Sequence, residues 1–196
     1  MSTPIQPEPL VLASESPRRA ELLRDAGYRF DIAKPILAEP HWVHPNVSPL
    51  MHVESLAYFK ASGIAGDHAG KTILAADTIA VLDGRVIGKP EDRDDARDIL
   101  RRLSGTSHSV ITGVAILHPA SGRRMLQHNI SMILVRQLDD AMIDRYLDTG
   151  KWQGKAGAYG IQDQDDPFVE KVSGSFTNVV GLPLEMLVQM FEHWEQ

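Results

Sequence analysis

The sequence predicts an α/β protein, in which strand-like and helix-like segments alternate along most of the chain. The central observation is the apolar run of residues 73–82, which is long enough for a buried strand. Asp83-Gly84 then forms a typical two-residue hairpin turn, and residues 85–87 begin a return strand. The second observation is the amphipathic spacing of several other segments, clearest in residues 91–103. Together the two patterns indicate a mixed fold of strands and helices.

The remaining elements are predicted from caps, turns and apolar spacing. Ser16 with Pro17, and Ser48 with Pro49, each have the pattern of an N-cap followed by a proline in the first helical turn. Helices are expected at residues 17–26, 49–65, 91–103, 139–147 and 183–194. Further strands are expected at residues 10–13, 28–33, 109–117 and 123–135, and a final hairpin pairs residues 168–172 with 176–180.

The composition limits the classes of function. A chain of 196 residues suits a single domain, expected at residues 10–196, after a proline-rich and flexible segment at residues 1–9. The net charge of -6 argues against binding of nucleic-acid polymers or membrane surfaces, although it allows a local basic pocket. The lack of cysteine excludes disulfides and thiolate chemistry. Without a signal peptide or a membrane-length apolar segment, a soluble cytoplasmic protein is expected.

Asp77 is the most informative residue, because it lies in the middle of the apolar run. A buried carboxylate is costly unless it is paired, hydrogen-bonded or bound to a metal. Thr78 follows it, and Lys89 lies just past the hairpin, close enough to fold back towards the strand. A carboxylate that caps a loop at a strand end is the simpler interpretation. Because Thr78 and Lys89 are also out of place in an ordinary hairpin, we favour a functional site.

Arg18 and Arg19 fall in the first turn of the helix expected at residues 17–26, directly after a buried strand. They oppose the helix dipole there, which is unfavourable for stability. Free backbone N–H groups and two guanidinium groups together suit a phosphate, so we favour an anion site over a solvated surface turn. Lys60 lies beside apolar positions of the next helix and either extends to solvent or reaches a phosphate, which the spacing does not decide.

Residues 149–167 form a long glycine-rich and polar stretch, a composition that suits a functional loop. The Gln162 amide within it can both donate and accept hydrogen bonds, as pairing with the edge of a base requires. From the residues alone, a flexible surface loop is an equally good interpretation. In the proline-rich residues 34–49, Glu39 is the only carboxylate, and His41 and His44 are expected to be exposed rather than a metal pair.

Six short motifs occur in the order and spacing of a known family. They are Ser14-Glu15-Ser16-Pro17-Arg18-Arg19, Ala76-Asp77-Thr78, Gly88-Lys89-Pro90, Leu103-Ser104-Gly105, Lys155-Ala156-Gly157-Ala158-Tyr159-Gly160-Ile161-Gln162 and Val180-Gly181-Leu182-Pro183. On these motifs, residues 10–192 resemble the Maf family, the septum-formation-inhibitor-like nucleoside triphosphate pyrophosphatases. The resemblance implies an elongated mixed β-sheet with surrounding helices and two lobes around a cleft, similar to inosine triphosphate pyrophosphatases.

The resemblance also implies hydrolysis of a nucleoside triphosphate to the monophosphate and pyrophosphate. The motifs look like the dTTP/UTP-preferring subgroup, whereas the 7-methyl-GTP subgroup tends to have glutamine in place of Thr78. Asp77 would be the catalytic base, and it would hold a divalent metal (Mg²⁺ or Mn²⁺, with Co²⁺ as a further option) together with Glu39. Lys89 would be catalytic by stabilising the leaving pyrophosphate. Substrate binding would fall to Ser14, Arg18, Arg19, Lys60, Thr78 and Gln162.

One departure concerns Glu39. Family members often carry further acids just before this glutamate, whereas here Ile36-Leu37-Ala38 precede it. The metal shell expected from the resemblance is therefore thinner here.

The resemblance implies a homodimer, with a nucleoside triphosphate as the small-molecule partner. Two other functions stay open: a pyrophosphatase for 7-methyl-GTP or another modified nucleotide, and a non-catalytic nucleotide-binding regulator of cell division. Asp77, Glu39 and Lys89 together favour an enzyme, because binding alone needs no base. A nicotinamide-binding Rossmann enzyme is disfavoured, because no G-x-G-x-x-G motif follows the first strand.

Overall fold

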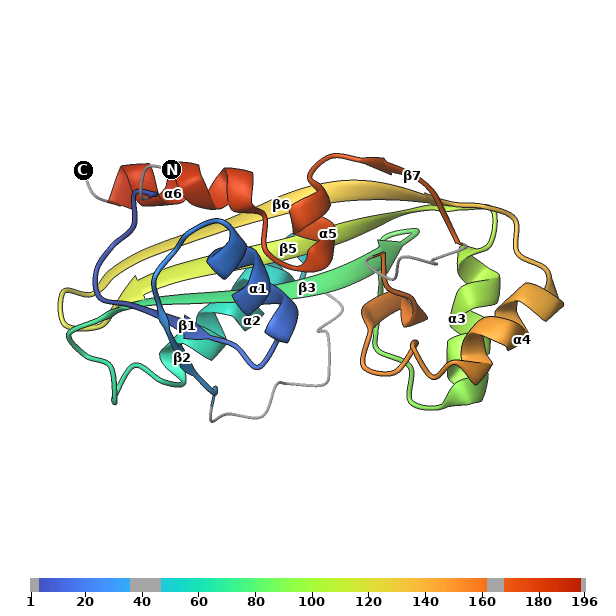
Figure 1. The fold of residues 1–196 in the computed structure, drawn as a ribbon, viewed down its shortest axis with the longest axis horizontal. Helices are drawn as coiled ribbons and strands as arrows, with labels where there is room; N and C mark the ends of the chain where they lie inside the picture. The colour runs from blue at the N-terminus through green and yellow to red at the C-terminus, as the bar shows by residue number, and fades with distance from the viewer. Residues whose placement is uncertain (1–3, 36–46, 162–167, 195–196) are drawn as a thin grey trace.

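The computed structural model describes residues 4–35, 47–161 and 168–194, and these form an α/β structure on one mixed sheet (Figure 1). The strands of the described residues are β1 (Leu10–Ala13), β2 (Asp31–Ala33), β3 (Thr72–Leu82), β4 (Arg85–Ile87), β5 (Ser107–His118), β6 (Arg123–Val135) and β7 (Val169–Ser173). Their order is β2-β1-β3-β5-β6-β7, and β4 also pairs with β3. β1 is parallel to β2 and β3, and the other pairs are antiparallel. The predicted α/β class with a mixed sheet is confirmed.

Helices cover both faces of this sheet. They are α1 (Pro17–Asp25), α2 (Pro49–Ser62), α3 (Arg93–Leu103), α4 (Asp140–Asp148), the short 3₁₀ helix η1 (Ala156–Ala158), α5 (Phe176–Val180) and α6 (Leu184–Trp194). Alternate residues of β3 point to opposite faces. Leu74 and Ala76 therefore pack with α1 and α6, whereas Ile73 and Ala75 pack with α2. Further along β3, Ala80 joins a separate core with α3 and α4.

Figure 1 shows α1 and α6 towards one end of the elongated sheet and α3 and α4 at the other. The core packed with α1 and α6 and the core packed with α3 and α4 are therefore separate. The paired edge of β3 changes partner in the same region. β1 is in register with Thr72–Leu74, and β4 with Ala80–Leu82. Among the described strands, residues 75–79 consequently pair with β5 alone, on the other edge. Asp77 and Thr78 therefore lie on an unpaired strand edge between the two lobes.

Gly113 lets α2 approach the sheet next to this edge. It stands opposite Asp77 in the β3–β5 register. A Cβ atom at Gly113 would lie 2.6 Å from the carbonyl oxygen of Val53 on α2, well inside contact distance. Because backbone atoms cannot easily move aside, only glycine permits this close packing. The approach brings side chains of α2 within reach of Asp77.

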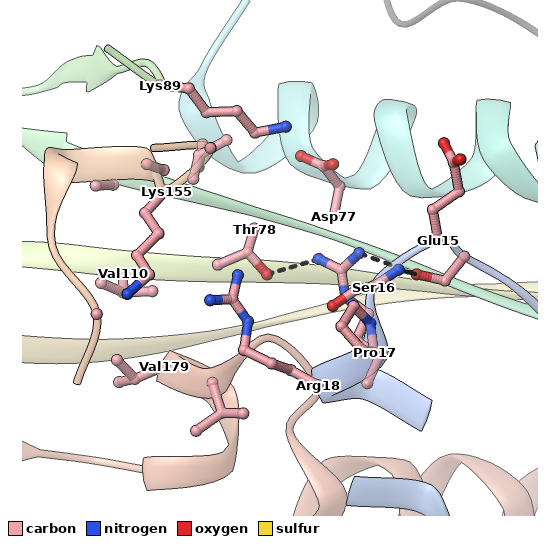
Figure 2. A pocket seen from close by; sticks show the side chains of 18 of the residues that line it. Glu15, Ser16, Pro17, Arg18, Asp77, Thr78, Lys89, Val110, Lys155 and Val179 are labelled. Carbon is pink, nitrogen blue, oxygen red and sulfur yellow. Dashed lines mark hydrogen bonds between the residues drawn. The ribbon is translucent and has the colours of Figure 1, made fainter. Parts of the chain in front are cut away.

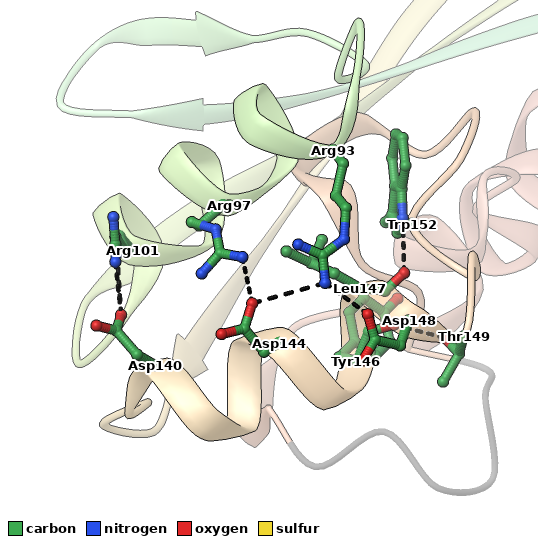
Figure 3. Close-up of polar contacts among 10 residues, drawn as sticks. All are labelled: Arg93, Arg97, Arg101, Asp140, Asp144, Tyr146, Leu147, Asp148, Thr149 and Trp152. Carbon is green, nitrogen blue, oxygen red and sulfur yellow. Dashed lines mark hydrogen bonds and ion pairs between the residues drawn. The ribbon is translucent and has the colours of Figure 1, made fainter.

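A ladder of ion pairs joins α3 and α4 in the other lobe (Figure 3). The pairs are Arg93–Asp148, Arg93–Asp144, Arg97–Asp144 and Arg101–Asp140. Hydrogen bonding from Arg97 holds the pKa of Asp144 below its usual value. Because these pairs are exposed and solvent screens them, we assign the ladder an orienting role for the helix pair rather than a large contribution to stability. After α4, the Trp152 indole donates to the Leu147 carbonyl at 3.1 Å and anchors the start of the loop that leads to η1.

The expected final hairpin is wrong in its second half, because residues 176–180 form α5 rather than a strand. Gly174 has φ 111° and ends β7, and the Ser175 side chain then accepts a hydrogen bond from the Asn178 N–H. This N-cap satisfies a free backbone donor and starts a helix despite the β-branched residues that follow. Gly181, with φ 123°, ends it.

The other predicted elements are present with small changes of boundary. The Asp83-Gly84 turn has φ values of 50° and 75°, as a type I′ turn requires. The helix expected to reach residue 65 ends at Ser62, and the strand expected from residue 28 begins at Asp31.

The part of the chain that the structure describes contains no helix with the length and apolar character of a membrane span. In the segment predicted to be flexible, the Gln6 side chain exchanges two hydrogen bonds with the Arg29 backbone.

Candidate active site

A cavity of about 790 Å³ opens at the unpaired edge of β3, between the two lobes (Figure 2). Its walls come from the turn between β1 and α1 and the first turn of α1, from β3 and β5, from the Lys89 segment after β4, and from the loop around η1. Lys60 of α2 and the end of α5 complete them. Basic side chains predominate over acidic ones in this lining. The basic residues are Arg18, Arg19, Lys60, Lys89 and Lys155, and the acidic residues are Glu15 and Asp77. A cationic cavity in an acidic protein suits a polyanionic ligand.

The Asp77 carboxylate forms a buried ion pair inside the cavity. Asp77 Oδ1 lies 2.5 Å from the Lys60 Nζ atom, and each side chain is 10% exposed. Lys60 is therefore neither a solvent-exposed side chain nor simply a phosphate ligand, because its ammonium group holds the candidate base. In Figure 2 the Lys89 side chain points towards Asp77 from the other side of the cavity. The two lysines give the carboxylate a strongly cationic environment.

The two adjacent arginines of α1 have different surroundings. Arg19 Nε donates to the Gly181 carbonyl at 2.8 Å, and its Nη2 donates to Thr78 Oγ1 at 3.1 Å. Arg19 therefore ties α1 to β3 and to the segment after α5. The Arg18 side chain instead projects into the cavity in Figure 2. Both arginines line the predicted anion site, and Arg18 is the one whose guanidinium group faces its interior.

The turn from β1 into α1 is organised by Ser14. Its Oγ atom accepts a hydrogen bond from the Ser16 N–H at 3.1 Å, and the residue is 5% exposed. Ser16 occupies the predicted N-cap position, but its side chain makes no capping hydrogen bond. The backbone N–H groups of the first turn of α1 therefore have no acceptor from Ser16. Such donors can contribute to binding an anion.

Lys155 and Tyr159 are cavity residues that sequence reasoning did not single out as site residues. The Lys155 side chain runs across Gly160, where a Cβ atom would lie 2.4 Å from Lys155 Nζ. A side chain at position 160 would force the flexible end of Lys155 to shift, so glycine leaves room for the lysine along this loop. The signal available in the sequence was a lysine beside several glycines in a loop already expected to be functional.

Tyr159 forms a hydrogen bond with the buried His108 of β5. The Tyr159 hydroxyl and His108 Nε2 are 2.8 Å apart, and His108 is 1% exposed. Burial lowers the pKa of His108 from 6.5 to about 4, because charging a buried imidazole is unfavourable. The imidazole is consequently neutral in the folded protein at neutral pH.

This burial predicts a pH dependence of stability. Below pH 6.5 the unfolded chain takes up a proton at His108, whereas the folded protein does so only near pH 4. The neutral, buried His108 therefore costs no stability above pH 6.5. As the pH falls from 6.5 to 4, the free energy of unfolding decreases by about 3 kcal/mol. Urea unfolding of the wild type and of His108→Gln between pH 4 and 7 measures it. We expect a shallower pH dependence in the variant, and equal slopes would contradict the account.

Two predicted site residues, Glu39 and Gln162, lie outside the described residues, as do His41 and His44. Among residues 4–35, 47–161 and 168–194, no cluster of three or more histidine, cysteine, aspartate or glutamate side chains gathers around one point. Glu15 borders the cavity, but its carboxylate pairs with Lys34 at 2.5 Å and is 62% exposed. Asp77 is therefore the buried carboxylate of the described lining.

Comparison with known proteins assigns the chain that forms this cavity to a family. The sequence pattern of the family described as Maf-like protein matches residues 9–194. The chain belongs to the Maf family. The predicted resemblance is confirmed over nearly the whole chain, including every segment that lines the cavity.

Individual Maf relatives are similar over more than nine-tenths of their lengths. A dTTP/UTP pyrophosphatase of Pelotomaculum thermopropionicum is 42% identical over 93% of this chain and 95% of its own. One from Symbiobacterium thermophilum is 45% identical, over 92% of this chain and 91% of its own. The crystal structure of a nucleoside-triphosphatase / dITP/XTP pyrophosphatase from Mycobacterium abscessus overlaps 66% of this chain and 75% of its own, at 17% identity and a TM-score of 0.43.

Proposed function

We propose that this Maf protein hydrolyses nucleoside triphosphates, with dTTP and UTP preferred, to the monophosphate and pyrophosphate. The observation that carries the proposal is the buried Asp77 carboxylate at the base of a cavity lined by five cationic side chains. The relatives named dTTP/UTP pyrophosphatase support the choice of substrate. A cavity of about 790 Å³ is of the size that small-molecule sites have.

In the proposed reaction, water attacks the α-phosphorus. A bond forms between the water oxygen and this phosphorus, and the bond from the phosphorus to the oxygen that bridges to the β-phosphorus breaks. The water proton goes to Asp77, whose Oδ1 is held by Lys60 while Oδ2 is the oxygen that we assign to the base. Pyrophosphate leaves with its negative charge stabilised by Lys89 and Arg18.

The other residues would bind and orient the substrate. Ser14 shapes the turn at the start of α1, where backbone donors and Arg18 would hold phosphate oxygens. Arg19 would act mainly by fixing Thr78, a selectivity position. Lys155 adds a cation that the resemblance had not assigned. Gln162 and Glu39 keep their proposed roles in base selection and metal binding.

A divalent cation fits this donor set. Mg²⁺ is commonly bound through one or two carboxylates together with substrate phosphate oxygens and water. Asp77 offers a carboxylate oxygen beside the proposed phosphate positions, and Glu39 would add a second. Bound there, the cation would supply neutralisation of phosphate charge and a lower pKa of bound water.

Pyrophosphate release from a panel of nucleoside triphosphates tests the proposal. We expect cleavage of dTTP and UTP well above 7-methyl-GTP, arrest by a chelator, and recovery with Mg²⁺, Mn²⁺ or Co²⁺. Preferential cleavage of 7-methyl-GTP would replace the substrate assignment while keeping the chemistry. Nucleotide binding without pyrophosphate release under any metal would favour the regulator.

The homodimer and the cytoplasmic location also belong to the proposal. Several large apolar side chains on neighbouring elements are exposed, namely Ile130 and Met132 on β6 and Phe176 on α5. Such side chains are suitable for contact with a second copy. Sedimentation of the purified protein would give the oligomeric state.

A further inference from the structure

A chain of hydrogen bonds runs from the cavity into the sheet behind it. Arg19 Nη2 donates to Thr78 Oγ1 at 3.1 Å, and Thr78 Oγ1 lies 2.9 Å from Thr112 Oγ1. Thr112 Oγ1 in turn donates to the Asn178 carbonyl at 2.9 Å. Thr78 is half-buried and lines the cavity, whereas Thr112 is fully buried behind it. Figure 2 shows the first of these bonds at the labelled Thr78.

The direction of each hydrogen bond in this chain follows from proton counting. A threonine hydroxyl has one proton to donate and two lone pairs to accept. Because a carbonyl only accepts, the single proton of Thr112 is used on Asn178. Thr112 must then accept from Thr78, so the Thr78 proton points into the sheet. Arg19 donates to one lone pair of Thr78, and the other lone pair stays available. Because Thr78 lines the cavity, a ligand can donate to it.

The inner end of the chain is rigidly placed. Thr112 and Thr78 stand directly opposite each other in the β3–β5 register. Asn178 is fully buried on α5, and its side-chain amide donates to the Val110 carbonyl and to Ser131 Oγ, each at 3.0 Å. These contacts fix the Asn178 backbone against β5 and β6. The acceptor that orients Thr112 therefore does not move with the ligand.

We propose that Thr112 is a positioning residue that makes the Thr78 hydroxyl an acceptor-only group towards the substrate. Such a group takes an N–H donor from the ligand and rejects a ligand acceptor. The uracil and thymine rings carry an N3–H donor, whereas the corresponding N3 atom of cytosine is an acceptor. The inference rests on the proposed function, and it explains a uracil or thymine preference by the proton arrangement behind Thr78.

The test measures binding selectivity, which does not need turnover. Dissociation constants are compared for α,β-non-hydrolysable analogues of UTP and CTP with the wild type, Thr112→Val and Thr112→Ser. The valine removes the inner acceptor, which lets the Thr78 proton turn towards the cavity, so the preference for the uridine analogue should fall roughly tenfold. Serine keeps the hydroxyl and should keep the preference. A folded Thr112→Val protein with the wild-type preference would overturn the proposal.

A measurement on the wild type alone covers the case in which Thr112→Val does not fold. The uridine analogue is compared with its N3-methyl derivative, which lacks the N3–H donor. We expect the methyl derivative to bind at least roughly tenfold more weakly than the uridine analogue. Equal binding of the two would overturn the proposal. Pyrophosphate release by the wild type is recorded separately. Failure to cleave UTP or dTTP would count against the proposed function, whereas the binding ratios decide the role of Thr112.

Discussion

Asp77→Asn is expected to lower the rate of pyrophosphate release by at least roughly 10²- to 10⁴-fold, the usual contribution of a general base. The asparagine has the size of aspartate but cannot take the proton from water. It can still accept a hydrogen bond from Lys60, which now donates to Asp77 at 2.5 Å. The protein should therefore fold and bind nucleotide. Steady-state kinetics with dTTP and UTP, together with thermal unfolding, measure both effects.

A matched control for this substitution is Asp83→Asn. Asp83 lies in the exposed turn between β3 and β4 and has φ 50°, a conformation that asparagine adopts readily. The same chemical change six residues from Asp77 should leave turnover and stability near the wild-type values. A folded Asp77→Asn protein with near-normal activity would remove Asp77 from the mechanism.

Lys60→Met is expected to lower the free energy of unfolding by about 3–5 kcal/mol, because it leaves a buried carboxylate without its partner. The two side chains of the Lys60–Asp77 pair are each 10% exposed, so water can replace only part of the lost contact. Methionine preserves most of the length and the apolar stem of lysine. Chemical denaturation at pH 7 measures the loss. Turnover should fall too, because Lys60 holds the proposed base in position.

Lys71→Met provides the control, because Lys71 pairs with Asp31 at 2.9 Å on the surface, with side chains 37% and 68% exposed. Removing an exposed pair should change stability by at most about 1 kcal/mol. The double variant Lys60→Met/Asp77→Asn should be more stable than Lys60→Met alone, since neither charge is then left unpaired. Equal losses in Lys60→Met and Lys71→Met would contradict the buried-pair account.

The sequence revealed the site where a local pattern carried the information. Asp77 stood out because a carboxylate interrupts an apolar run, and Arg18 and Arg19 because they follow a strand at a helix start. The contact of Lys60 with Asp77 was not predictable, since it depends on how closely α2 packs over Gly113. Thr112 was missed for a similar reason, because its role depends on cross-strand register and on α5. Residues 176–180, which include the β-branched Thr177, Val179 and Val180, had been predicted as a strand.

The central claim is that Asp77 directs water to the α-phosphorus of a nucleoside triphosphate. Hydrolysis of dTTP or UTP in water labelled with heavy oxygen tests this most directly, because mass spectrometry then shows which product gains the label. The account predicts that the label appears in dTMP or UMP and that pyrophosphate is unlabelled. Label in pyrophosphate, or release of orthophosphate in its place, would contradict attack at the α-phosphorus and with it the assigned chemistry.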